Sequence, residues 1–113
     1  MHELSIAMNI ADLATGHALK AGAERVRSIE LDIGALSGVE IGALTFAMDI
    51  AFKDTLLEGA EVKVNRIEAC CECPDCGHES DPDNLAAGCP FCGGSNVRIS
   101  RGMEMQLNSL LIE

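Results

Sequence analysis

Two copies of one five-residue motif, Cys-Pro-x-Cys-Gly, constrain the fold of this chain more than any other feature of its sequence. They occupy residues 73–77 and 89–93, and twelve residues separate their inner cysteines. Each Cys-x-x-Cys turn directs two sulfur atoms to one point, where a tetrahedral metal ion would lie about 2.3 Å from each. The glycine that follows allows a positive φ angle, so backbone N–H groups can point at the thiolates. The repeat predicts a closed four-thiolate zinc site with the ligands Cys73, Cys76, Cys89 and Cys92.

A closed site leaves no position for a substrate, so its predicted role is structural. The alternative is a pair of redox dithiols, which twin motifs of this type disfavour. Cys70 and Cys73 also have Cys-x-x-Cys spacing, but the repeat favours Cys73 and Cys76 as ligands. Cys70 and Cys71 are then either small, partly buried residues or spare thiols that exchange metal or oxidise. His78 is interpreted as a surface residue, with a hydrogen-bond donor to the site or a transient ligand as alternatives.

Composition limits both the core and the partners. The chain has 113 residues, which suits one compact domain or one domain with a metal-stapled lobe. Hydrophobic residues make up 48% and aromatic residues only 3%, so the core must be aliphatic. Eight basic and eighteen acidic residues give a net charge of −10, which repels nucleic acids and anionic membranes and suits cations or basic partner surfaces.

The sequence points to the cytoplasm. The first ten residues contain no Lys or Arg, so the positively charged region of a secretory signal is missing. No apolar run approaches the roughly 20 residues of a membrane span. In the cytoplasm, paired Cys-x-x-Cys motifs indicate a metal before a disulfide.

Hydrophobic periodicity predicts two helices and three strands. The helices are expected at residues 4–21 and about 38–57, and the strands at residues 25–33, 61–67 and 103–112. The first helix should end near Gly22 and bury a stripe made of Leu4, Met8, Ala11, Ala14 and Ala18, which Ile6, Ile10 and Leu13 widen.

Two further details follow from the same patterns. Ser37 and Glu40 have the spacing of a capping box that would open the second helix, and Gly59 would end it. The last strand should present one apolar face, formed by Met103, Met105 and Leu107.

All six cysteines and all three prolines lie in one segment, residues 69–101, which has too few large apolar residues to fold by burial alone. We therefore predict an α+β fold with two lobes. A small three-stranded sheet with two helices would use residues 1–68 and 103–113. A zinc-ribbon lobe, residues 69–102, would be inserted before the last strand.

The chain begins Met1-His2-Glu3. The α-amine, the amide of residue 2 and the imidazole lie within chelating reach of one another, and the next amide can complete a plane. Planar nitrogen donors suit Ni²⁺ and Cu²⁺. The simpler interpretation is a frayed surface histidine, and the three residues alone do not decide between the two.

A resemblance adds to this pattern. Four motifs follow one another along the chain. The first is the opening Met-His-Glu-Leu-Ser, and the second is Ile-Gly-x-Leu-Ser-Gly-Val-Glu at residues 33–40, with Leu44, Phe46 and Ala47 after it. The paired cysteine motifs come third, and the ending Gly-Met-Glu-Met-x-Leu with Ile112-Glu113 comes last. Together they resemble the HypA/HybF family of hydrogenase nickel-insertion chaperones over the whole chain.

The resemblance implies a nickel-binding α/β lobe and a zinc-ribbon lobe. It implies that His2 binds Ni²⁺ with backbone nitrogens of Met1, His2 and Glu3, and that Glu3 and Glu40 lie near the nickel. It also implies delivery of Ni(II) to the large subunit of a nickel–iron hydrogenase together with a maturation GTPase, and it allows urease maturation as a second client. Such a protein is a binding protein and not an enzyme. The adjacent pair Cys70-Cys71 departs from the simplest family pattern.

Two other function classes fit the sequence less well. A zinc-ribbon nucleic-acid adaptor is disfavoured by the net charge of −10 and by the lack of basic or aromatic clusters. A thiol redox enzyme using Cys70 or Cys71 is disfavoured because Glu68 and Glu72 would raise the pKa of such a thiol. His17 lies too far along the first helix to join a site at His2, and we expect it on the surface or in a groove.

Overall fold

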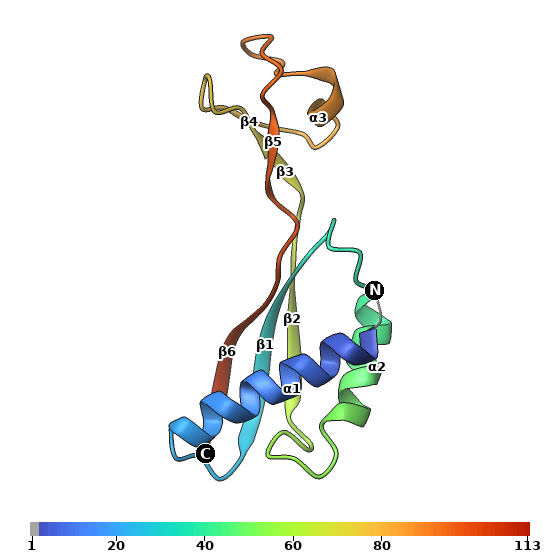
Figure 1. The fold of residues 1–113 in the computed structure, drawn as a ribbon, viewed down its shortest axis with the longest axis vertical. Coiled ribbons are helices and arrows are strands. Elements are labelled where there is room, and N and C mark those ends of the chain that lie inside the picture. The colour runs from blue at the N-terminus through green and yellow to red at the C-terminus, as the bar shows by residue number, and fades with distance from the viewer. Residues whose placement is uncertain (1–2) are drawn as a thin grey trace. The chain divides into compact units, whose positions relative to one another are not determined.

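The structure, a computed structural model, describes residues 3–113 (Figure 1). Its elements in chain order are α1 (Glu3–Lys20), β1 (Val26–Gly34), α2 (Ile41–Ala51), β2 (Glu61–Ile67), β3 (Cys70–Glu72), β4 (Glu79–Ser80), α3 (Asn84–Ala87), β5 (Arg98–Arg101) and β6 (Met105–Ile112). The strands form two three-stranded sheets, with the orders β2-β1-β6 and β4-β3-β5. The predicted α+β class is confirmed, and the cysteine-rich part contributes a small sheet of its own.

The chain divides into two compact units. The first comprises residues 1–32, 38–65 and 106–113, and the second comprises residues 33–37 and 66–105. Two assignments stay predictions: residues 1–68 with 103–113 as a nickel-binding lobe, and residues 69–102 as a zinc-ribbon lobe. In the described residues, no helix is long and apolar enough to cross a membrane.

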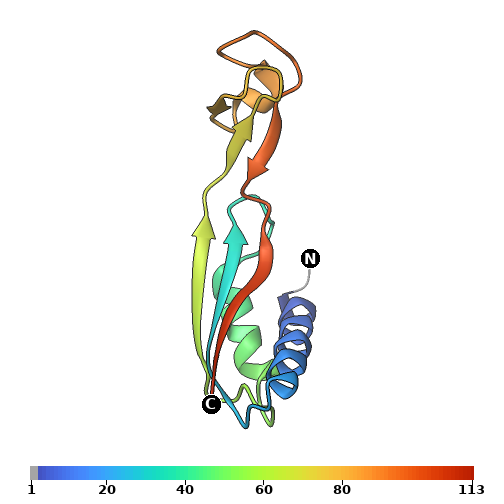
Figure 2. The ribbon, with the colours of Figure 1, turned by 90° about the vertical axis from the view of Figure 1, so that its left-hand side faces the viewer.

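The first unit is a sheet with helices on one face. α1 and α2 lie on the same side of the sheet (Figure 2), and they pack against each other. The central strand β1 buries Ile29 and Leu31 under these helices, while Glu30 and Asp32 alternate with them on the open face. There Asn65 Nδ2 donates to both carboxylates, at 2.8 Å and 3.0 Å. The period-two pattern in the sequence therefore predicted this strand correctly.

The buried stripe of α1 differs from the prediction. Ala11, Ala14 and Ala18 are buried as expected, but Leu4 and Met8 are 46% and 54% exposed. Ile6, which was expected to widen the stripe, is buried, and so is Ala7, which was not part of the predicted stripe. The buried face is thus rich in alanine, whose small side chain allows close packing of the helix. As predicted, α1 stops before Gly22, which has a φ of 72°.

α2 is shorter than predicted, and its predicted cap is wrong. It begins at Ile41 and ends at Ala51. Glu40 is itself the N-cap residue, because its carboxylate accepts hydrogen bonds from the amides of Gly42 and Ala43. The predicted N-cap, Ser37, lies three residues before the residue that caps the helix, so the helix begins later than the Ser37 pattern predicted. Gly59 lies in the loop between α2 and β2 and does not end the helix.

β6 also differs from the expectation. It begins at Met105, two residues later than predicted. Met103 and Met105 are 57% and 41% exposed, so the expected apolar face is not buried. β6 pairs with β1 alone in its sheet and is therefore an edge strand, which leaves much of its surface open.

Candidate metal centre

The core of the second unit is built from cysteines. Its fully packed cluster consists of Cys71, Cys73, Cys89 and Val97, with Cys76 and Ile99 packed against it. The strand β3 pairs with β4 on one side and with β5 on the other, and it ends directly before Cys73. Cysteine side chains take the place that large aliphatic side chains have in most cores. Any interaction that holds the cysteine sulfur atoms together therefore also stabilises this sheet.

The two Cys-Pro-x-Cys-Gly turns have the same backbone geometry. In the first, the amide of Gly77 donates to the carbonyl of Cys73 and the amide of Cys73 donates to the carbonyl of His78. In the second turn, the amide of Gly93 donates to the carbonyl of Cys89 and the amide of Cys89 donates to the carbonyl of Gly94, both at 2.9 Å. Gly77 and Gly93 have φ angles of 77° and 73°, which glycine adopts without strain. The sequence repeat is therefore a structural repeat.

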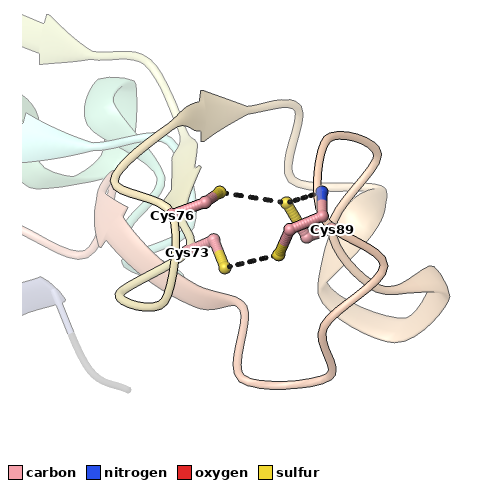
Figure 3. A group of neighbouring side chains, drawn as sticks. Cys73, Cys76 and Cys89 are labelled. Carbon is pink, nitrogen blue, oxygen red and sulfur yellow. Dashed lines mark hydrogen bonds between the residues drawn. The ribbon is translucent and has the colours of Figure 1, made fainter.

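The sulfur atoms of the four predicted ligands lie around a common centre, and Figure 3 shows Cys73 and Cys76 facing the turn that carries Cys89. Sγ of Cys73 lies 3.6 Å from Sγ of Cys92, and Sγ of Cys76 lies 3.6 Å from Sγ of Cys89. All four lie within 4.8 Å of one another. A disulfide would bring two sulfur atoms to about 2.05 Å, so these are four free thiols facing a common centre.

This donor set fits a tetrahedral thiophilic cation. A tetrahedron with four sulfur atoms about 2.3 Å from its centre has edges of about 3.8 Å, close to the observed 3.6 Å. Four thiolates form the ligand set of structural zinc sites, and they leave no open position for a substrate. Backbone amides of Phe91 and Cys92 donate to Sγ of Cys89 at 3.4 Å and 3.5 Å, which helps to carry thiolate charge.

The thiols influence one another's protonation. Hydrogen bonds from the amides of Cys92 and Phe91 lower the pKa of Cys89 to about 7. At Cys76, the hydrogen bond from the amide of His78 acts in the same direction, but burial and the facing thiol groups outweigh it and raise the pKa to about 12. The facing Cys73 and Cys89 raise the pKa of Cys92 as well, against the hydrogen bond from Gly94. One thiolate forms readily, and further negative charge at the same centre requires a cation.

His78 contacts this centre. Its Nδ1 atom lies 3.4 Å from Sγ of Cys76, and its ring stacks on Phe91, with centroids 4.3 Å apart. Both rings are on the surface, as the sequence predicted for His78, and the imidazole also lies where it can donate to Sγ of Cys76. Sequence reasoning missed the role of Phe91, although its position inside the second cysteine motif was a signal.

Cys70 and Cys71 lie outside the four-sulfur cluster. Cys71 is fully buried in the core beside Cys73, whereas Cys70 is half-buried. Sγ of Cys70 contacts the carboxylate of Glu79 at 3.4 Å. Arg101 donates to the same carboxylate at 2.8 Å. The structure thus separates two adjacent cysteines into a core residue and a residue that lines a surface cavity of about 550 Å³.

The residues proposed for nickel are only partly described. Met1 and His2 lie outside the described residues. Glu3 is the first residue of α1 and is half-buried, and both carboxylate oxygens of Glu40 are engaged in capping α2. His17 is exposed and lines a cavity of about 450 Å³ together with residues of β6.

Comparison with known proteins assigns the chain to a family. The family model for HypA, described as a metallochaperone for hydrogenase and urease nickel incorporation, matches residues 1–112. The chain belongs to the HypA family. It is 40% identical to the hydrogenase maturation factor HypA of Chlorobaculum parvum over 113 residues, which cover 100% of both chains.

Solved HypA structures share the fold. A solution structure of a HypA protein matches with a TM-score of 0.80 and 29% identity, covering 100% of this chain and 97% of the other. The solution structure of the Ni metallochaperone HypA from Helicobacter pylori matches with a TM-score of 0.73 and 30% identity, covering 99% and 97%. Membership of the HypA family places the chain among hydrogenase maturation factors and nickel metallochaperones, and it confirms the family inferred from the sequence motifs.

Proposed function

We propose that this chain is a nickel metallochaperone that delivers Ni(II) to the large subunit of a nickel–iron hydrogenase during maturation. The match of the HypA family model to residues 1–112 carries this proposal. The proposed nickel ligands are His2 and the backbone nitrogens of Met1, His2 and Glu3, a planar nitrogen set of the kind that Ni²⁺ prefers.

We further propose that Cys73, Cys76, Cys89 and Cys92 bind one structural Zn²⁺. The sulfur separations of 3.6 Å and the closed arrangement support this assignment. The zinc would stabilise the second unit and would take no part in chemistry, which is consistent with a cytoplasmic binding protein and not an enzyme.

Glu40 is a weaker candidate for nickel than the terminus. Its two oxygens already accept hydrogen bonds from the first turn of α2, so binding a metal there would compete with the cap. Its capping role explains its position without a metal.

The proposed partners are a hydrogenase-maturation GTPase and the hydrogenase large subunit, with urease-maturation proteins as further candidates. The net charge of −10 favours basic partner surfaces and disfavours nucleic acid and anionic membranes. It would also attract Ni²⁺ to the chain.

The decisive test is transfer of the cargo. Untagged protein loaded with radioactive nickel is mixed with a nickel-free large subunit precursor, with and without the GTPase, and nickel in the large subunit is measured after separation. We expect transfer from the native chain and loss of transfer from His2→Ala protein that keeps its zinc. Equal transfer by the His2→Ala protein, or by free nickel at the same concentration, would refute the proposed delivery.

A further inference from the structure

The 33–37 segment comprises the last two residues of β1 and the start of the loop that leads to α2, and it belongs to the second unit. Residues up to 32 and residues from 38 onward belong to the first unit. This segment is part of the Ile-Gly-x-Leu-Ser-Gly-Val-Glu motif of the sequence, and none of residues 33–37 is among the proposed metal ligands. Its position indicates a connecting role.

Three backbone hydrogen bonds fasten the segment within the second unit. The amide of Gly34 donates to the carbonyl of Glu104 at 2.7 Å. The next two amides, of Ala35 and Leu36, donate to Ile67 at 2.9 Å and to Gly102 at 2.7 Å, respectively. The segment is thus bonded to the chain on both sides of the cysteine-rich part, because residue 67 precedes it and residue 102 follows it.

Close backbone contacts make this attachment sensitive to small changes. A Cβ atom on Gly34 would overlap the carbonyl group of Gly102. A Cβ atom on Gly102 would lie 2.7 Å from Cα of Ala69, and its φ of 112° disfavours other residues. We call this close approach of Gly34, Ala69 and Gly102 the Gly102 crossing, and the amide of Gly102 donates to Oε1 of Glu104 at 2.7 Å, which holds it in place.

The crossing is continuous with the strands that lead to the cysteine cluster. Arg101, which precedes Gly102, pairs with Cys70 in β3, and β3 leads directly into Cys73. The β3–β5 pair packs on the cysteine core. The four thiols that would bind the cation belong to this core or pack against it, so a bound cation would hold the two cysteine turns and the strand pair together.

The other end of the segment leads to α2. Three residues after Ser37, Glu40 caps the helix, and the carbonyl of Glu40 accepts the first bond of its first turn from the amide of Leu44 at 2.9 Å. The placement of residue 37 therefore limits the conformations open to the cap.

We propose that the 33–37 segment couples metal loading of the four-cysteine site to the order of the first turn of α2. With metal bound, the cysteine core holds β3 and β5, the Gly102 crossing is formed, and the segment is fixed. Without metal, the crossing loosens and the start of α2 frays. The proposal rests on the proposed metal site, and it assigns to the Gly34–Gly102 contact the role of transmitting the state of that site.

Amide hydrogen exchange on the full, zinc-loaded chain tests the coupling, before and after zinc is removed with a chelator. On removal we expect exchange to become about tenfold faster or more at Ala35, Leu36 and Leu44, as for local opening of a cooperative unit. The amide of Val26, bonded to Leu56 at 2.9 Å in the first unit, should keep its protection and serves as the internal control. Unchanged exchange at Ala35 and Leu36 together with faster exchange at Cys73 and Cys89 would overturn the coupling and leave the metal site intact. Unchanged exchange at Cys73 and Cys89 would refute the metal site itself, and the coupling with it.

A substitution at the crossing separates coupling from zinc loss. Gly34→Ala should accelerate exchange at Leu36 and Leu44 while zinc stays at one per chain. The matched control is Gly16→Ala in α1, where an added Cβ meets no atom within 4 Å. If Gly34→Ala does not fold, Glu104→Ala removes the bond to Gly102 more gently. Normal exchange at Leu44 in a variant whose Leu36 exchanges faster would show that the segment does not transmit to α2.

Discussion

The ring of His78 stacks on the ring of Phe91, with an interplanar angle of 16° and centroids 4.3 Å apart. One residue follows the first cysteine motif and the other lies inside the second, so the stack joins the two turns across the cluster. The same contact holds Nδ1 of His78 at 3.4 Å from Sγ of Cys76.

Removal of this stack should speed metal release without abolishing binding. An aromatic pair contributes about 0.5–1.5 kcal/mol beyond its buried area, so Phe91→Ala should raise the rate of zinc loss to a chelator about two- to tenfold. The control is Leu85→Ala, which truncates another exposed apolar side chain of the same unit. Equal release rates in Phe91→Ala and the native chain would show that the stack does not restrain the cluster.

Loss of one ligand should unfold the second unit. Cys89→Ser removes a sulfur that is both a core residue and a proposed ligand, and metal binding supplies on the order of 10 kcal/mol in small zinc modules. We expect loss of zinc and collapse of NMR dispersion for residues of β3, β4 and β5. The control is Cys70→Ser, which lies outside the cluster and should keep both the bound zinc and the dispersed NMR signals of these strands. A metal-free Cys89→Ser protein with a fully dispersed spectrum would contradict this account.

Acid should release zinc. Thiolates bind the metal and thiols do not, and the pKa values of about 7 for Cys89 and about 12 for Cys76 mean that protons occupy most of the free site near neutral pH. Binding therefore displaces protons, and affinity must fall as pH falls, by about tenfold per pH unit for each proton displaced. Competition with a chromophoric chelator from pH 8 to pH 5.5 measures this slope. An affinity independent of pH would exclude thiolate ligation.

Nickel binding should need a free terminus. His2→Ala removes the imidazole, and an N-terminal tag converts the α-amine of Met1 into an amide. Each change should weaken nickel binding at least about tenfold, or about 1.4 kcal/mol, while zinc stays at one per chain. Glu40→Gln, which keeps part of the cap, should have a smaller effect. Calorimetry in a non-chelating buffer provides the comparison, and a tagged chain that binds one nickel as tightly as the native chain would rule out the amine as a ligand.

The cluster of four cysteines could be predicted from the sequence because its determinants are local. The spacing of Cys73 and Cys76, a proline between them and a glycine after them specify one tight turn, and a second copy supplies the facing turn. The strands at residues 26–34 and 61–67 were predictable for a similar reason, since alternation of apolar and polar residues encodes one buried face. The family resemblance likewise depended on linear motifs.

Other features depended on which surfaces meet. Leu4 and Met8 are as hydrophobic as Ile6, so periodicity alone could not decide that the alanine-rich face of α1 would be buried. The stack of His78 on Phe91 joins residues from separate turns, and no local pattern encodes it.

The start of α2 shows the division most clearly. By itself the sequence determined that a helix follows residue 37 and that Ser37 and Glu40 both have capping chemistry. Only the tertiary structure decided between them. The 33–37 segment is hydrogen-bonded within the second unit, so the helix begins later and Glu40 caps it. The total free energy of the fold decides between a local cap and non-local backbone hydrogen bonds. That free energy depends on residues far apart in the sequence, so a short stretch of sequence does not predict the outcome.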